Sequence, residues 1–342
     1  MRYLVLLGLI IGSLLGYYVL WSHLADQVEM QANSWIDGQR RLGRTVTYEG
    51  LRVWGFPYRL SLTFSKTSWA DTPNPLGWRV EAEAITAHMQ LWNMHHAIFD
   101  LPGRQTIAWR ENGSDRQLTL TSARFRASLV ADGAGNWLRM AADISKPQLG
   151  GANIGDIEGA WSADKLLLHS RRAGNVPPSI DLAVQADKLM LPPVFDGLLG
   201  REVQGLRLAG NARGTVFGRT LEEILSSWRD SGGVIDFSTL ALSWGEMHIE
   251  GTGTLALDRQ FRPLGAMGGR VRNAEAAIDA LVVAGRMSQN EGAAAKAAIA
   301  VIEKEDDNKG RLYLPIAFTA QDGQLFLGPA PLFSLTSVLP KP

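Results

Sequence analysis

Residues 58–64 read Tyr-Arg-Leu-Ser-Leu-Thr-Phe, with a large apolar side chain at every second position. Successive side chains of a β-strand point to opposite faces of a sheet, so this alternation predicts a strand with one apolar and one polar face. The same period recurs in residues 180–186, which read Ile-Asp-Leu-Ala-Val-Gln-Ala. Strict alternation is typical of antiparallel sheets that bury one face and leave the other in water.

Glycine and proline separate many such stretches. Gly55-Phe56-Pro57 is a predicted turn between a strand that begins at Thr45 and the strand that begins at Tyr58. Gly245-Glu246 is a predicted hairpin turn between strands at 235–244 and 247–258. Other strands are predicted at 78–91, 105–110, 117–130, 137–144, 154–161, 165–170, 203–216, 311–320 and 324–327. We therefore expect a mainly β protein of the α+β kind, with long curved antiparallel sheets and a few helices.

Three short helices are predicted between the strands. Thr220 precedes the first, at 221–229, and two glutamates in its first turn favour the helix dipole. Asn273 is the expected cap of a second helix at 274–283, and an alanine-rich stretch at 291–304 predicts a third.

Before these elements lies an apolar stretch, Leu4 to Trp21, that carries no charge over 18 residues. A helix of about 20 residues crosses a hydrocarbon core of roughly 30 Å, and aromatic rings such as those at its end suit the membrane–water interface. A cleaved signal would have a shorter apolar region and small residues before its cleavage site. The nearest match is His23-Leu24-Ala25, in which His23 is too large. We therefore expect an uncleaved transmembrane anchor.

Flanking charges predict the orientation of this anchor. Arg2 and the terminal amine precede it, whereas Asp26 and Glu29 follow it. Positive charge favours the cytoplasmic side, so in a bacterium the anchor would cross the inner membrane once and leave the bulk of the chain in the periplasm. The expected organisation is an anchor at 1–21, a stalk helix at 22–44 and a β-rich periplasmic domain at 45–342, with two halves at 45–190 and 191–342.

Composition excludes several classes of function. With 34 basic and 34 acidic residues, the chain lacks the excess positive charge that nucleic-acid binding requires. Because it has no cysteine, it has no disulfide, no thiolate metal ligand and no thiol nucleophile. The adjacent His95 and His96 would point to opposite faces of a strand, and Glu305-Asp306-Asp307 lacks the spacing of a calcium loop. We expect no metal and no cofactor.

The sequence also lacks a recognisable catalytic motif. Asp230-Ser231-Gly232-Gly233 is similar to the nucleophile segment of trypsin-like proteases, but a helix end followed by a glycine turn explains it. We expect no catalytic residue and no enzyme activity. The alternative is an envelope hydrolase or sugar-modifying enzyme with strand-borne carboxylates. Its candidate pairs are Asp181 with Asp187 and Glu246 with Glu250.

Eleven tryptophans are many for 342 residues. The first interpretation is core packing of broad side chains. The alternative is an apolar groove between sheet and helices that holds an acyl chain. The residues expected at the groove or its rim are Trp54, Phe56, Tyr58, Trp92 and Trp244.

Several segments resemble one family. They are the anchor, residues 53–59 (Val-Trp-Gly-Phe-Pro-Tyr-Arg), the region of Trp92, and the closing Leu-Pro-Ile at 314–316 with Gly-Gln-Leu-Phe-Leu-Gly-Pro-Ala-Pro-Leu at 323–332. The chain resembles the alphaproteobacterial family catalogued as domain of unknown function two-one-two-five. It departs from the family at Trp92-Asn93-Met94, where Trp-x-Pro is usual.

This resemblance implies a membrane-anchored, envelope-facing protein. It also implies a distant similarity to the AsmA-like envelope proteins, whose curved sheets carry an apolar groove and are linked to lipid movement between membranes. The analogy concerns the fold and transfers no catalytic residue. We expect an inner-membrane-tethered protein that binds a phospholipid or an envelope protein through an apolar groove, with a purely structural envelope scaffold as a further alternative.

Overall fold

The computed structural model describes residues 2–71, 77–111, 114–151, 153–154, 157–158, 160–175, 178–195, 199–218, 220–305 and 312–339. About 54% of the chain is strand and 25% helix, and the strands pair in antiparallel fashion, so the predicted mainly β fold is confirmed. The chain forms two compact units, Met1–Met140 (unit 1) and Ala141–Pro342 (unit 2). Parts of the strands predicted at 154–161 and 311–320, and Asp306 and Asp307 of the predicted turn, lie outside the described residues.

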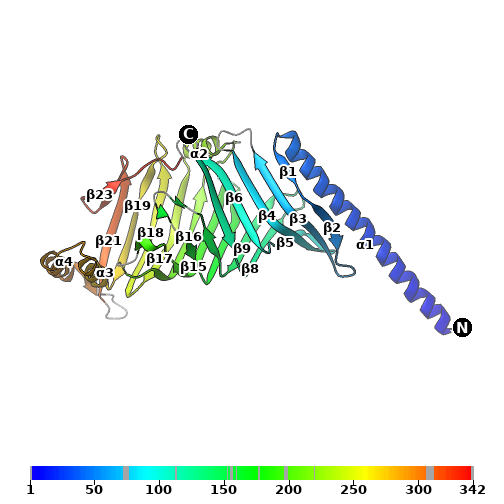
Figure 1. The fold of residues 1–342 in the computed structure, drawn as a ribbon, viewed down its shortest axis with the longest axis horizontal. Coiled ribbons are helices and arrows are strands. Elements are labelled where there is room, and N and C mark those ends of the chain that lie inside the picture. Colours follow the sequence, from blue (N-terminus) through cyan, green and yellow to red (C-terminus); the bar gives the residue numbers. More distant parts are fainter. Residues whose placement is uncertain are drawn as a thin grey trace. The chain divides into compact units, whose positions relative to one another are not determined.

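Unit 1 begins with a single long helix, α1 (Arg2–Arg41). The residues predicted as anchor and stalk are therefore continuous, and α1 is long and apolar enough to span a membrane. Its buried side chains, Ala25, Val28 and Ile36, all belong to its second half. Figure 1 shows this half beside the first strands of unit 1, while the N-terminal half extends away from them.

The strands that follow form an antiparallel sheet. They are β1 (Thr45–Thr47), β2 (Gly50–Trp54), β3 (Arg59–Asp71), β4 (Trp78–Gln90), β5 (Asn93–Asp100), β6 (Arg104–Glu111), β7 (Ser114–Thr121), β8 (Arg124–Ala131) and β9 (Trp137–Ser145), the last of which crosses into unit 2. β1 and β2 pair with opposite ends of β3, which pairs along its length with β4. The far edge of β4 is shared by β5, which continues to β8, and β6, which continues to β7.

The alternation of β3 changes phase at Lys66, whose φ is 46°. The register with β4 is the same on both sides of this residue, with Ser65 opposite Ala84 and Thr67 opposite Ala82. The side chains that face α1 are at even positions before Lys66, as at Phe64, and at odd positions after it, as at Trp69. One face of the sheet stays apolar along its length although the sequence pattern changes phase.

The core of unit 1 lies where α1 crosses β3. Leu60 is 0% exposed and Leu62 is 7% exposed, and both pack against Ala25 and Val28 of the helix. The two helix side chains are small, so the helix backbone lies close to the sheet. Partly buried side chains from β2, β4 and β5 surround this cluster.

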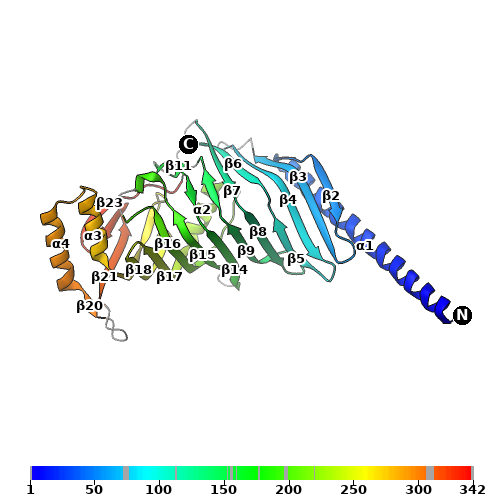
Figure 2. The same ribbon diagram turned by 60° about the horizontal axis from the view of Figure 1, so that its bottom comes forward.

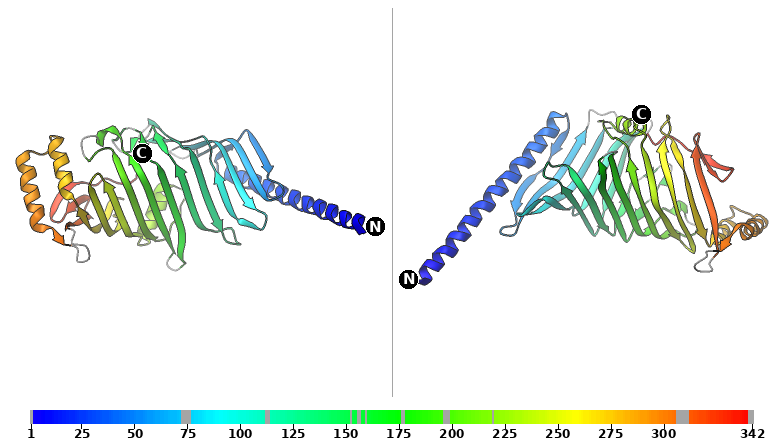
Figure 3. Two further views of the ribbon diagram at one scale, coloured as in Figure 1. Left: turned by 90° about the horizontal axis from the view of Figure 1, so that it is seen from below. Right: turned by 180° about the vertical axis from the view of Figure 1, so that it is seen from behind.

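Unit 2 is an antiparallel meander, seen from two sides in Figure 3. Its main strands pair in chain order, and they are β14 (Lys165–Asn175), β15 (Pro178–Met190), β16 (Glu202–Arg213), β17 (Val234–Trp244), β18 (Met247–Leu257), β19 (Pro263–Arg272), β21 (Leu312–Gln321), β22 (Gln324–Leu327) and β23 (Ala330–Ser334). Short strands complete it: β10 (Gln148–Gly150), β11 (Asn153–Ile154), β12 (Ile157–Glu158), β13 (Trp161–Ser162) and β20 (Lys304–Glu305). The hairpin predicted around Gly245-Glu246 is confirmed as β17–β18.

Among the described residues of unit 2, three α-helices interrupt this meander. α2 (Leu221–Asp230) begins as predicted, with a capping box between Thr220 and Glu223. α3 (Ala274–Val283) has the predicted bounds, but the predicted cap is wrong. Asn273 adopts a left-handed backbone conformation, and its side-chain amide donates instead to the Glu246 carbonyl at 2.9 Å.

α4 (Gln289–Ile302) starts two residues before the predicted helix because Ser288 forms a capping box with Glu291. It pairs with α3, beside which it lies in Figure 2, through an ion pair between Lys296 and Asp279 at 2.6 Å.

The core between α1 and β3 makes a direct prediction. Leu60→Ala removes a fully buried side chain and leaves a cavity, so we expect the free energy of unfolding to fall by about 2–5 kcal/mol. Leu138→Ala, at a side chain that is 39% exposed in β9, is the matched control and should cost about 0.5 kcal/mol or less. Denaturant unfolding in detergent micelles, followed by tryptophan fluorescence, measures both. Equal losses would show that the helix–sheet contact is not the core.

Candidate functional site

An apolar cavity of about 300 Å³ lies between α1 and the sheet of unit 1. Helix α1, the segment around β1, and strands β3, β4 and β5 all contribute to its wall. Its largest lining side chains are Trp35, Ile36, Phe64, Trp69, Val80 and Phe99. It is adjacent to the core cluster, because Ala32 and Phe64 belong to both.

Side-chain size explains why the helix and sheet part here. Ala32 presents only a methyl group toward the sheet, whereas broad rings stand around it. Trp35 of the helix meets Trp69 of β3 edge-on with ring centroids 5.9 Å apart, and Tyr48 meets Phe64 at 5.3 Å. Rings in these arrangements brace one another and leave the space between them open.

The polar atoms in the cavity wall are already engaged or shielded. The Thr67 hydroxyl donates to the Ala82 carbonyl at 3.3 Å, and the Tyr48 hydroxyl donates to the side-chain oxygen of Asn33 at 3.4 Å. The indole N–H of Trp69 is shielded from water and has no acceptor among the described residues. The lining is therefore almost entirely apolar and suits apolar matter.

A charged group stands beside the cavity wall. The guanidinium of Arg44 lies over the rings of Trp69 and Trp78, 5.7 and 6.0 Å from their centroids, and is 3.6 Å from the Asp71 carboxylate. The ion pair and the two cation–π contacts hold Arg44 against the aromatic wall. Its charge is therefore compensated by Asp71.

The five residues predicted for the groove lie elsewhere. Trp54 is on the opposite, polar face, where its N–H donates to the Thr63 hydroxyl at 3.0 Å. Tyr58 and Trp92 are exposed in turns, and Trp244 belongs to unit 2, where its N–H donates to the Gly200 carbonyl at 2.8 Å. Figures 1 and 2 label β2, which carries Trp54, and β17, which carries Trp244.

Phe56, the fifth, packs against aromatic rings of α1. None of the five lines the cavity, whereas Trp69, which was not predicted for the groove, does. Phe64 and Trp69 share a face of the sheet although they are an odd number of residues apart, because the alternation changes phase at Lys66. A pattern of strict alternation therefore does not group them.

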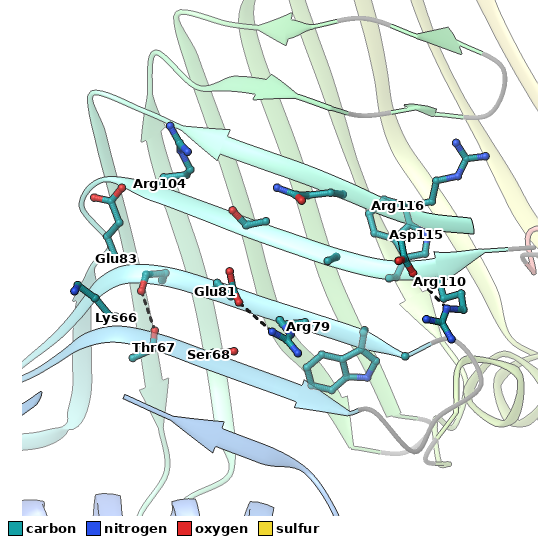
Figure 4. A pocket seen from close by; sticks show the side chains of 17 residues that line it. Lys66, Thr67, Ser68, Arg79, Glu81, Glu83, Arg104, Arg110, Asp115 and Arg116 are labelled. Atoms are coloured by element: carbon teal, nitrogen blue, oxygen red, sulfur yellow. Dashed lines mark hydrogen bonds and ion pairs between the residues drawn. The ribbon is translucent and has the colours of Figure 1, made fainter. Parts of the chain in front are cut away.

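The other face of the same strands carries a polar hollow of about 990 Å³, shown in Figure 4. Arg79 and Glu81 line it and alternate along β4 with Val80 and Ala82, which line the apolar cavity. Its charged side chains are Lys66, Arg79, Glu81, Glu83, Arg104, Arg110, Asp115 and Arg116.

Ion pairs offset much of this charge. Arg79 lies 3.6 Å from Glu81, and Arg110 lies 3.3 Å from Asp115, as the dashed lines in Figure 4 mark. Each of these four side chains is about half exposed or more, so the pairs contribute little to stability. The hollow is the wet face of an antiparallel sheet.

A hydrogen-bonded chain crosses β3, β4, β5 and β8 on this polar face. The Ser61 hydroxyl lies 2.8 Å from Nδ1 of His88, Nε2 of His88 lies 3.2 Å from the Asp100 carboxylate, and Arg126 donates to Asp100 at 2.8 Å. Because the carboxylate accepts, Nε2 carries the imidazole proton and Nδ1 accepts from Ser61. Sequence patterns did not indicate this group, because its members are far apart in the chain and meet only through strand pairing.

The network has the members of a serine hydrolase triad but not its accessibility. Ser61 is 0% exposed, so no substrate carbonyl can reach its oxygen. Burial, and then the positive charge of Arg59, lower the pKa of His88, so the ring is neutral at neutral pH. The hydrogen bond from Arg126 lowers the pKa of Asp100. These residues form a structural cross-strand network.

The carboxylates named for the hydrolase alternative are engaged by their neighbours. Asp181 accepts from Arg171 at 2.6 Å and from Asn211 at 2.8 Å, and the Arg171 bond lowers its pKa. Glu250 lies 3.5 Å from both Arg270 and Arg272.

The second carboxylate of each candidate pair has different neighbours. Asp187 accepts from the side-chain amide of Gln185 at 3.0 Å, and Glu246 follows Gly245 in the β17–β18 turn. The hydrogen bond from Arg171 keeps the Asp181 carboxylate ionised, which suits a structural ion pair.

Fold and site together define a class of protein: a β-rich chain that follows one helix long and apolar enough to span a membrane, with an apolar cavity beside that helix. The chain belongs to the family described as uncharacterized protein conserved in bacteria (DUF2125), whose model matches residues 21–335. The predicted family is thereby confirmed. Neither a curated protein nor a solved structure matches the chain.

His88 predicts a pH dependence of stability. Because its pKa is lower in the folded state, the unfolded chain binds more protons between the folded pKa and the ordinary value of about 6.5. The contribution of His88 is therefore complete above about pH 6.5 and is lost as the pH falls through the folded pKa. We expect the melting temperature to fall on mild acidification, and His88→Gln to flatten this part of the curve.

Thermal melts across this pH range, followed by circular dichroism, measure the effect. His169→Gln, at an exposed position of unit 2, removes a histidine without touching the network and should leave the curve as in the parent. An unchanged curve in His88→Gln would contradict the assignment of the neutral ring.

Proposed function

We propose that the protein is tethered to the bacterial inner membrane by residues 4–21 of α1, faces the periplasm, and holds the hydrocarbon chain of a phospholipid in the cavity of unit 1. The uncharged stretch and the charges that flank it support the tether and its orientation. The cavity supports the ligand class.

The observation that carries this proposal is the apolar lining of the cavity. Ligand pockets occupy about 300–1,000 Å³, so a volume of about 300 Å³ is at the lower end of that range. Such a cavity suits part of one hydrocarbon chain rather than a whole lipid with its headgroup. Apolar cavities bind apolar ligands because no hydrogen bond to water has to be replaced.

The position of the cavity along α1 favours the hydrocarbon chain of a lipid that has left the bilayer. Ala32 lies eleven residues after Trp21, which is roughly 16 Å along a helix. The cavity is therefore beyond the apolar segment of the anchor. Lipid that occupies it would be bound by the protein and not by the surrounding membrane.

A row of apolar side chains connects the level of Trp21, at the end of the uncharged stretch, with the level of the cavity. Leu91, Met89, Ala87 and Ile85 alternate along the β4 face that α1 crosses, and all four are half-buried. Ile85 lines the cavity, and Leu91 lies in the turn after β4, at the end of the sheet near Trp21. Six residues of strand span roughly 20 Å, similar to the rise of the helix over the same interval.

The other two functions have less support. An enzyme would need an accessible reactive group, and Ser61 is buried while Asp181 and Glu250 are held by arginines. A purely structural scaffold, or a protein that binds an envelope partner without lipid, would leave the cavity empty. The experiment below separates these from lipid binding.

Photo-crosslinking tests the proposal on the full chain. In membranes that contain phospholipid with a diazirine on its acyl chain, we expect adducts on peptides that carry residues 32–36 and 80–85, in addition to the anchor. Ala32→Phe fills the cavity and should reduce the adducts at these peptides several-fold, while leaving those on the anchor unchanged. Peptide mapping by mass spectrometry measures both.

Ser34→Phe is the matched control, because Ser34 is exposed on the same helix turn. It should leave the pattern as in the parent. Adducts confined to the anchor in the parent protein would refute lipid binding in the cavity and favour the scaffold.

A further inference from the structure

Two neighbouring turns of unit 1 present aromatic side chains at the same end of the sheet. One joins β2 to β3 and contains Phe56 and Tyr58, and the other joins β4 to β5 and contains Trp92. Because Arg59 pairs with Gln90 across β3 and β4, the two turns lie side by side. We call Phe56, Tyr58 and Trp92 the aromatic rim.

The rim is attached to the end of the apolar segment of α1. The Tyr17 hydroxyl donates to the Pro57 carbonyl at 2.5 Å, and the indole N–H of Trp21 donates to the Arg59 carbonyl at 3.0 Å. The Phe56 ring packs against Tyr17, Tyr18 and Trp21, with centroids 5.5–5.9 Å apart. These contacts set the position of the turn along the helix axis.

The attachment to α1 determines how deep the aromatic rim would lie in a membrane that α1 spans. From Tyr17 to Trp21 is the last turn of the uncharged stretch, about 6 Å of helix. If the stretch crosses the hydrocarbon core, this turn lies at its boundary with the headgroups, where tyrosine and tryptophan are enriched. The rim, which contacts this turn, lies at the same boundary.

The surface of the rim has the chemistry of that boundary. Phe56, Tyr58 and Trp92 are 44%, 76% and 71% exposed, although large rings normally bury most of their area. Residues 53–62 and 87–97 contain no aspartate or glutamate, and the Arg59 side chain is exposed between the turns. Rings with a polar edge, a cation and no anion match the acyl–headgroup region of a phospholipid bilayer.

We propose that the aromatic rim inserts into the interface of the membrane that α1 spans, so that unit 1 touches the bilayer at a second place. A single transmembrane helix is free to rotate and tilt, whereas a helix with a laterally displaced contact is not. The rim therefore fixes the orientation of unit 1 on the membrane. This inference depends on α1 spanning a bilayer and not on what occupies the cavity.

The absence of cysteine from the chain makes the test clean. Tyr58→Cys and Trp92→Cys, each carrying a nitroxide spin label, are reconstituted as full chains in vesicles of phosphatidylethanolamine and phosphatidylglycerol. Oxygen concentrates in hydrocarbon and a nickel chelate in water, so the ratio of their collision rates reports immersion. We expect this ratio to be several-fold higher at both rim positions than at the control.

Leu42→Cys is the control. Leu42 is 52% exposed and directly follows α1, roughly 30 Å along the helix from Trp21, so it lies in water under the proposal. Equal ratios at positions 42, 58 and 92 would overturn the inference. Labels at 58 and 92 that are shielded from both oxygen and nickel would show a protein partner on the rim and would also overturn it.

Circular dichroism of each labelled chain confirms that the sheet has formed before the measurement. The test is independent of the crosslinking experiment above. Rim labels immersed in the bilayer, without adducts at residues 32–36, would support this inference and reject the lipid ligand. Adducts at residues 32–36 with rim labels in water would support the lipid ligand and reject this inference.

Discussion

The contact between α1 and β3 is the constraint on which unit 1 depends. Ala25 and Val28 are small enough for the helix to lie directly on Leu60 and Leu62, which are almost completely buried. One rigid helix that is pinned at this point holds its apolar N-terminal half clear of the sheet. The same contact defines what lies on either side of it: the aromatic turns toward the anchor, and the cavity in the other direction.

Local patterns predicted many of the elements because their causes are local, but the strand predicted at 117–130 is two strands, β7 and β8. The alternation that begins at Leu60, the capping residue Thr220 and the uncharged stretch of α1 each act within a few residues. The cavity could not be predicted in this way, since it depends on the phase change at Lys66 and on the path of the helix over the sheet. The network of Ser61 with its neighbours likewise arises from strand register, which single stretches of sequence do not specify.

The sheet of unit 1 separates two chemistries that share the same strands. Along β4, Arg79 and Glu81 face water, while Val80 and Ala82 face the cavity, so each function of the sheet uses alternate residues. The buried hydrogen bonds of His88 lie on the polar side of Leu60 and Leu62 and tie β3, β4 and β5 together. Stiffness on one face therefore supports the shape of a cavity on the other.

The two hydrogen bonds from Tyr17 and Trp21 would matter more at the edge of a bilayer than in water. At the edge of a bilayer the local dielectric is below that of water, and a donor that loses water must find another acceptor. The carbonyls of Pro57 and Arg59 accept these hydrogen bonds, so the turn and the helix satisfy each other. A helix that is bonded to the sheet in this way transmits its own position to the sheet. Under the proposal that α1 spans a bilayer, the apolar row of β4 has one end at the membrane boundary and the other at the cavity.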